Sequence, residues 1–229
     1  MKKADKKADR PIEYSVGFCN FLGCKIDLSL KPMIPRKETE FWLKRAIRDI
    51  CKKGEKFTFL DVFSGSGCIG IAVLKNCSKW AKMGVFSDID GCCIKQAKIN
   101  LKLNRIKPRK YKVIQSDIFS NLRTSQVLNF DYIFANPPYI ALKRKHLVQK
   151  SVLDYEPHLA LFAGADGMLY IKRFLKDARK YLKKHGKIYL EFDYFQKKEI
   201  EKLLVQFNYK NFKFHKDQFD KWRWVCIKN

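Results

Sequence analysis

The sequence predicts an α/β fold: a doubly wound, mostly parallel sheet of seven strands with helices on both faces. Two observations support this. From residue 56 onward, short apolar segments of strand length alternate with segments whose apolar residues recur at helical spacing. The chain then closes with two strand-like segments, 207–214 and 223–228, joined by a short polar loop, which predicts a C-terminal antiparallel strand. Because parallel strands need crossover connections, the alternation indicates that the other strands are parallel.

Each element follows from its local pattern. The first buried strand is expected at 56–63, and a glycine-containing turn leads from it into a helix at 68–75. Asp90 is suited to cap a second helix, whose apolar positions are Ile94, Ala97 and Leu101. Further parallel strands are expected at 83–89, 111–117, 130–135 and 187–193. The remaining helices are expected, after a long irregular stretch, at 167–184 and 199–205.

The first 55 residues differ in pattern from the rest. Residues 1–10 are charged and predict a disordered basic tail. The segment 11–30 predicts a short hairpin with turns at Gly17 and Gly23, and residues 38–51 predict an amphipathic helix. We therefore divide the chain into the tail, a hairpin and helix over 11–55 that cover one side of a substrate cleft, and a main domain over 56–229.

Composition excludes several classes of protein. Hydrophobic residues make up 46% of the 229 residues, enough for a sizeable core, yet no run of about 18 apolar residues predicts a membrane span. No apolar segment follows the charged N-terminus, so we expect no secretory signal and a cytoplasmic protein. The eight cysteines show neither CxxC pairs nor zinc spacing, which favours reduced thiols and no bound metal.

The formal net charge of +25 raises the question of nucleic-acid binding. Lysines are spread through almost every segment, however, and do not gather in one stripe. The charge is equally compatible with a transient contact to an acidic partner or to the surface of the ribosome.

A glycine-rich loop and an acidic residue predict a nucleoside-bearing cofactor. In LDVFSGSGCIG, residues 60–70, Gly65 and Gly67 allow a tight strand-to-helix turn, although two glycines alone also suit a plain turn. Asp88 ends the second strand, where a carboxylate can accept both hydroxyls of a ribose; helix capping is the alternative, but Asp90 is better placed for it. No Lys-Ser or Lys-Thr follows the glycines, so a P-loop is excluded.

Two more loops lie at the carboxyl ends of strands. Asp117 and Ile118 follow the third strand, where they suit an adenine edge, although an ordinary loop acid is an equal alternative. Asn136-Pro137-Pro138-Tyr139 follows the fourth. The prolines remove two N–H donors and stiffen the backbone, so this segment presents mainly acceptors. Such a rim can hold a planar –NH₂ group and stabilise positive charge that develops on its nitrogen.

These motifs, in this order, resemble class I S-adenosylmethionine-dependent methyltransferases, and NPPY narrows the resemblance to enzymes that methylate amides or exocyclic amines. MIPRKETEFWL, 33–43, and YEPHLALFAGADGMLYIKRF, 155–174, resemble segments of the release-factor glutamine methyltransferases. The upstream hairpin is also similar, so the resemblance covers about residues 11–193. It implies a Rossmann-like methyltransferase domain over 56–229 and methyl transfer to the glutamine of the GGQ motif in peptide chain release factors.

The resemblance also implies roles for particular residues. S-adenosylmethionine, which leaves as S-adenosylhomocysteine, would contact Phe63, Ser64, Gly65, Ser66, Gly67, Asp88, Asp117, Ile118 and Asn136. The catalytic residues would be Asn136, Pro137 and Tyr139. The glutamine would contact Asn136, Pro137, Pro138, Tyr139 and Arg36. Thr39 and Glu40 would stand near the cleft without an assigned role.

The sequence departs from the family in three places. Phe63 stands where the family has the first glycine of its loop, and Lys37 replaces a proline. About ten charged residues precede the hairpin, which predicts that the usual N-terminal helical domain is lacking.

Three other functions fit parts of the pattern. They are methylation of a ribosomal-protein glutamine, N6-adenine methylation of nucleic acid, and a silent binding module on a methyltransferase scaffold. The absence of a spare target-recognition segment disfavours the second, and an intact Asn136 and Asp88 disfavour the third.

Overall fold

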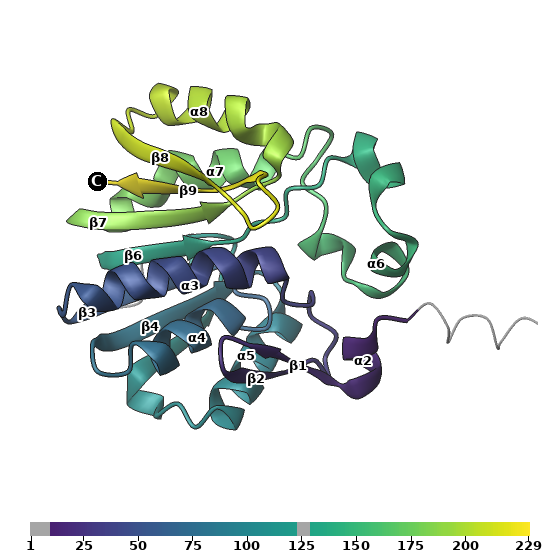
Figure 1. Ribbon diagram of the computed structural model, residues 1–229, viewed down its shortest axis with the longest axis horizontal. Helices are drawn as coiled ribbons and strands as arrows, with labels where there is room; N and C mark the ends of the chain where they lie inside the picture. The colour runs from purple at the N-terminus through teal and green to yellow at the C-terminus, as the bar shows by residue number, and fades with distance from the viewer. Residues whose placement is uncertain (1–9, 123–128) are drawn as a thin grey trace, which may run out of the picture.

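The computed structural model describes residues 10–122 and 129–229, so the predicted tail lies outside the described residues apart from Arg10. A seven-stranded sheet runs in the order β5-β4-β3-β6-β7-β9-β8 (Figure 1). Its strands are β3 (Phe57–Val62), β4 (Ala81–Asp88), β5 (Tyr111–Gln115), β6 (Phe130–Ala135), β7 (Leu182–Glu191), β8 (Asn211–Lys216) and β9 (Trp222–Lys228). All neighbouring pairs are parallel except those of β9, which runs antiparallel to β7 and β8. The predicted sheet is confirmed.

Helices cover both faces of this sheet, as expected for parallel strands (Figure 1). One core contains Trp42 of α3 (Lys37–Lys52) and Ile71 of α4 (Cys68–Asn76), packed on Phe59 and Phe134. The opposite core contains side chains of α7 (Leu169–Asp177) and α8 (Lys197–Gln206), packed on Leu60 and its neighbours. Phe59 and Leu60 therefore face opposite sides, as the period of a strand requires.

The N-terminal segment begins with a helix that the sequence pattern did not predict. Helix α2 (Ile12–Val16) ends at Gly17, whose φ of 84° is the left-handed conformation that favours glycine. The hairpin follows as β1 (Phe18–Phe21) and β2 (Cys24–Asp27), with Gly23 in its turn. It packs against α5 (Gly91–Leu103), where Asn100 Nδ2 and Asn104 Nδ2 donate to backbone carbonyls of β2.

The segment after β6 also differs from expectation. The irregular stretch contains a short helix, α6 (Lys150–Tyr155), and two 3₁₀ helices, Leu142–Leu147 and His158–Ala160. The helix predicted over 167–184 is wrong at its end, because α7 stops at Asp177, a 3₁₀ helix follows at Ala178–Tyr181, and β7 begins at Leu182. Leu182 pairs with Phe130 of β6, so sheet pairing overrides a helical spacing that continues through Leu182. Within the described ranges, no helix is both long enough and apolar enough to span a bilayer.

The expectation that all cysteines are reduced is wrong for one pair. Cys51, near the end of α3, and Cys77, which follows α4, form a disulfide across 26 residues of sequence. The other six cysteines are free. The pattern gave no signal for this pair, because its spacing matches no disulfide framework and the two helix ends meet only in the folded chain.

This disulfide should stabilise the oxidised protein. Closing a loop of this length lowers the entropy of the unfolded chain and contributes about 3 kcal/mol. We therefore expect reductant to lower the free energy of unfolding in urea by about that amount in the wild type, and to have no effect on Cys51→Ser. The exposed, free Cys92 offers a control, because Cys92→Ser should still respond to reductant. Equal stability of oxidised and reduced wild type would contradict this account.

Candidate active site

One cavity lies where the carboxyl ends of β3, β4, β5 and β6 meet. Its lining includes eight of the nine residues predicted to contact the cofactor: Phe63, Ser64, Gly65, Ser66, Asp88, Asp117, Ile118 and Asn136. The ninth, Gly67, is the N-cap of α4 with a φ of 80° and donates its N–H to Ser64 O at 2.7 Å. The structure thus brings together residues from four separate loops.

Phe63 occupies the first position of the glycine loop in a conformation that glycine adopts more easily. Its φ is 60°, in the left-handed region, where a bulky side chain is strained. Its ring packs against Tyr170 and Phe174, with centroids 6.2 and 6.3 Å away. This apolar packing offsets the backbone cost and places the phenyl ring in the wall of the cavity.

Asp88 combines a structural role with a position facing the cavity. Its Oδ2 accepts the Gly65 N–H at 2.8 Å and its Oδ1 accepts the Asp90 N–H at 3.0 Å. Each oxygen keeps a further lone pair for a ligand. Burial raises the pKa of this carboxyl, and the two amide hydrogen bonds oppose that shift. Asp90 caps α5 through the Cys92 N–H, as predicted.

Asp117 and Ile118 lie beside the cavity but differ in their partners. The Asp117 carboxylate forms an ion pair with Arg173 Nη2 at 2.7 Å on a partly exposed surface. Ile118 is buried, has a φ of 53°, and accepts a hydrogen bond from Ser87 Oγ at its carbonyl. Ile118 is therefore the apolar contact at this edge, while the Asp117 side chain is already paired.

The NPPY segment separates the first cavity from a second one. Asn136 and Pro138 line the first cavity, whereas Pro137 and Tyr139 line the second. Arg36 and Met33 line both. The second cavity is further lined by aromatic and basic side chains, including Arg144, whose guanidinium lies 3.6 Å from the ring centroid of Phe195. Two ligands can therefore approach the diproline corner from different sides.

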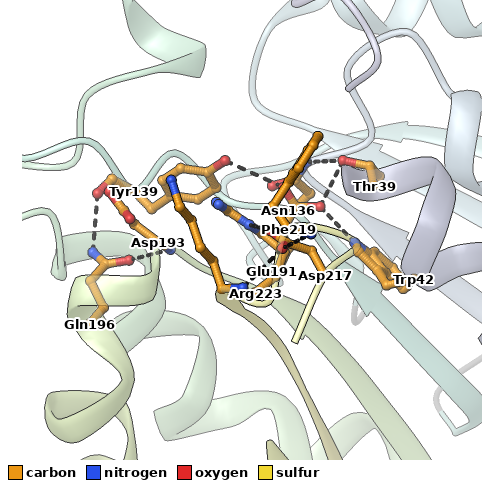
Figure 2. Close-up of polar contacts among 11 residues, drawn as sticks. Thr39, Trp42, Asn136, Tyr139, Glu191, Asp193, Gln196, Asp217, Phe219 and Arg223 are labelled. Atoms are coloured by element: carbon orange, nitrogen blue, oxygen red, sulfur yellow. Dashed lines mark hydrogen bonds and ion pairs between the residues drawn. The ribbon is translucent and has the colours of Figure 1, made fainter. Parts of the chain in front are cut away.

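Tyr139 is held at both its side chain and its backbone (Figure 2). Its hydroxyl donates to Glu191 Oε1 at 3.3 Å, and its carbonyl accepts Gln196 Nε2 at 3.1 Å. Gly167 packs so closely that a Cβ there would lie 2.4 Å from the Tyr139 carbonyl oxygen. Burial and the nearby Glu191 raise the pKa of the Tyr139 phenol, so it stays protonated and acts as a donor. The corner is accordingly fixed before any ligand arrives.

The segment 33–40 supplies the other wall of the site. Arg36 forms an ion pair with the buried Glu156 at 2.6 Å, and Thr39 lines the first cavity. Glu40 points elsewhere: it accepts the Leu22 N–H of the hairpin turn at 2.9 Å. Of the three residues expected near the cleft, Arg36 and Thr39 therefore line it, and Glu40 anchors the hairpin.

Sequence reasoning missed two buried carboxylates of this site. Glu156, in the YEPH segment, fixes Arg36, and Glu191 ends β7 beneath the NPPY corner. A glutamate in the otherwise apolar run IYLEF was an available signal, because a charge at the carboxyl end of a buried strand needs partners. Tyr170, which also lines the cavity, lay inside the segment 155–174, for which the resemblance assigned no role to this residue.

A glycine loop, an acid after the second strand and NPPY at one edge of a sheet with this strand order define a class I methyltransferase. Comparison with known proteins specifies it further. Residues 37–173 match the family described as Conserved hypothetical protein 95. The chain is 31% identical over 224 residues to a release factor glutamine methyltransferase of Flavobacterium psychrophilum, covering 96% of this chain and 76% of the relative.

A Streptococcus pneumoniae protein of the same name is 32% identical over 223 residues, covering 96% of this chain and 75% of the relative. The chain belongs to the family of release factor glutamine methyltransferases. Among solved structures, ribosomal protein L11 methylase from Lactobacillus delbrueckii subsp. bulgaricus has a TM-score of 0.59 at 20% identity, covering 86% of this chain and 80% of that one. That likeness supports the fold alone.

Proposed function

We propose that this protein transfers a methyl group from S-adenosylmethionine to the side-chain amide nitrogen of a glutamine in a peptide chain release factor. The observation that carries the proposal is the NPPY corner, which forms a wall of both cavities. A donor in the first cavity and a glutamine from the second would meet at Asn136. Family membership indicates the release factor as the protein that supplies the glutamine.

The first cavity suits this cofactor. Among the described residues, Ser64 Oγ is buried without a hydrogen-bond partner and lies in the cavity wall, ready for a polar group of the ligand. The spare lone pairs of Asp88 suit two ribose hydroxyls, and Ile118 suits the face of adenine. S-adenosylmethionine supplies a methyl group bound to a sulfonium sulfur. This sulfur is a good leaving group, so a weak nucleophile can attack the methyl carbon.

An amide nitrogen is a weak nucleophile because its lone pair is conjugated. Asn136 Oδ1 and the carbonyl of Pro137 would accept its two N–H groups and orient it toward the methyl carbon. When the carbon–nitrogen bond forms and the sulfur leaves as S-adenosylhomocysteine, the positive charge on the amide nitrogen would lie beside these acceptors, which would stabilise it. One N–H proton then leaves to water. Pro138, Tyr139 and Arg36 would shape the slot that keeps the carboxamide planar against the corner.

Two further properties belong to the proposal. We infer a cytoplasmic location, where release factors act, and a transient contact with the ribosome or RNA through the basic surface that a net charge of +25 creates. Such a contact would weaken steeply with added salt, whereas methylation of an isolated release factor would change less.

The decisive experiment offers S-adenosylmethionine with a labelled methyl group to the recombinant protein and four acceptors. These are a release factor, its GGQ→GGA variant, DNA and RNA. We expect label on the release factor and none on the other three. Label on DNA or RNA with an unlabelled release factor would overturn the proposal in favour of nucleic-acid methylation.

A further inference from the structure

A fully buried carboxylate that belongs to none of the predicted motifs lies beneath the NPPY corner. Glu191 Oε2 accepts two hydrogen bonds at 2.7 Å, from Thr39 Oγ1 and from Trp42 Nε1, and its Oε1 accepts the Tyr139 hydroxyl (Figure 2). Thr39 and Trp42 come from α3, Tyr139 from the loop after β6, and Glu191 from the end of β7. Three distant segments therefore converge on one side chain.

The donors around Glu191 Oε2 determine the direction of the hydrogen bonds that lead from it to Asn136. An indole N–H can only donate, so Oε2 of Glu191 is an acceptor toward Trp42. The Thr39 hydroxyl donates its one hydrogen to the same carboxylate oxygen. It can therefore only accept a hydrogen bond from its other neighbour. That neighbour is Asn136 Nδ2, 3.4 Å from Thr39 Oγ1. The amide nitrogen of Asn136 is therefore turned toward Thr39, and its oxygen faces away from Thr39.

This orientation matters because the two ends of an Asn amide have opposite properties. With the oxygen presented to the ligand, Asn136 accepts an N–H from a bound amide; with the nitrogen presented, two donors would face each other. We propose that Glu191 is a positioning residue that, through Thr39, sets the amide orientation of Asn136 and, through the Tyr139 hydroxyl, holds the far end of the same corner. This inference rests on the proposed function. It states how the side chains that would bind the glutamine amide are held in their orientation.

Groups around Glu191 stabilise the negative charge of its carboxylate. Burial raises the pKa of its carboxyl, while the hydrogen bonds from Trp42 and Thr39 and the positive charge of Arg223 on β9 oppose that shift; Glu38 on α3 acts in the same direction as burial. Arg223 is itself fixed by Asp217, with Nε 3.0 Å from Oδ2. The described surroundings thus include one cation and several donors that compensate a buried carboxylate.

The test is the variant Thr39→Val, which keeps the shape of the side chain and removes the hydroxyl. We expect kcat for release-factor methylation to fall roughly 10- to 100-fold, the range for a buried donor that loses its partner. KM for the release factor and Kd for S-adenosylmethionine should change less than about threefold, because the Thr39 hydroxyl is hydrogen-bonded to Glu191 and Asn136 and valine keeps the contribution of this side chain to the cavity wall. Thr39→Ser, which restores the hydroxyl, should recover kcat to within about threefold of wild type.

Thr58 provides a matched control. Its hydroxyl also bonds a carboxylate, Asp131 Oδ2 at 3.0 Å, but at the opposite end of β3 from the cavity. Thr58→Val removes the same kind of hydrogen bond and should leave kcat within about twofold. Wild-type kcat in Thr39→Val, or an equal loss in Thr39→Ser, would overturn the inference.

A double-mutant cycle separates positioning from packing. If Thr39 acts through Asn136, adding Thr39→Val to Asn136→Ala should cost no further activity; multiplicative losses would overturn the inference. If Thr39→Val does not fold, Glu191→Gln takes its place in the same cycle, with the same two outcomes. A failure of the proposed function is distinguishable, because the wild type would then label DNA or RNA, and the cycle can be measured with that acceptor.

Discussion

Asn136→Ala should lower kcat for release-factor methylation by about 10²- to 10³-fold, the typical loss when one preorganised group that stabilises developing charge is removed. Asn136 extends from the end of β6, in the middle of the sheet, and its orientation is set by Thr39. The proline carbonyls remain, so residual activity above the uncatalysed rate is expected. The loss should appear in kcat at saturating concentrations of both substrates.

Cofactor binding should distinguish this role from a general defect. The Kd for S-adenosylmethionine, measured by calorimetry, should change less than about threefold in Asn136→Ala, although Asn136 lines the cofactor cavity. Asn136→Gln offers a comparison, because it keeps the amide but displaces it by one methylene. A loss of affinity as large as the loss of kcat would contradict the role assigned to the side-chain oxygen.

Asp88→Ala should instead weaken cofactor binding roughly 100-fold, with kcat at saturating cofactor much less affected. The variant removes the acceptor that we propose for two ribose hydroxyls, and hydrogen bonds to a charged group are worth about 1.5–3 kcal/mol each. It also frees the Gly65 and Asp90 amides, which loosens the glycine loop. Asp117→Ala is a matched control, since the Asp117 carboxylate is paired with Arg173; its Kd should change less than about fivefold.

The pH dependence of binding has a definite sign. Burial raises the pKa of Asp88, and its ionised form is the one that we propose to accept both ribose hydroxyls. Wild-type affinity should therefore be complete above that raised pKa and fall as the pH is lowered through it, while Asp88→Ala should lack this transition. Equal pH profiles, or a wild-type Kd in Asp88→Ala, would show that the ribose is held elsewhere.

The sheet and the glycine loop could be predicted because their signals are local. Buried strands have characteristic lengths, glycines at 65 and 67 mark a strand-to-helix turn, and the diproline cannot continue β6. The antiparallel placement of β9 also followed from local pattern. The roles of Asn136 and Asp88 remain predictions, although the structure brings both residues to one cavity.

What could not be predicted depends on contacts between distant segments. Thr39 and Glu191 are 152 residues apart, and although a glutamate in the apolar run IYLEF signals a need for partners, nothing in its neighbourhood along the chain indicates that Thr39 is one of them. The disulfide arises in the same way, from two helix ends that meet only after folding. The early end of α7 is set by the pairing of Leu182 with β6, which no window of neighbouring residues reveals.

The position of β9 has a consequence for how the chain is assembled. During synthesis β8 emerges before β9, yet its place in the sheet lies beyond a gap that β9 alone fills (Figure 1). Until β9 leaves the ribosome, β7 keeps an unpaired edge and β8 has no neighbour to join. Arg223 of β9 also takes its place near Glu191 only then, so the chain completes its sheet and the surroundings of its NPPY corner in a single late step.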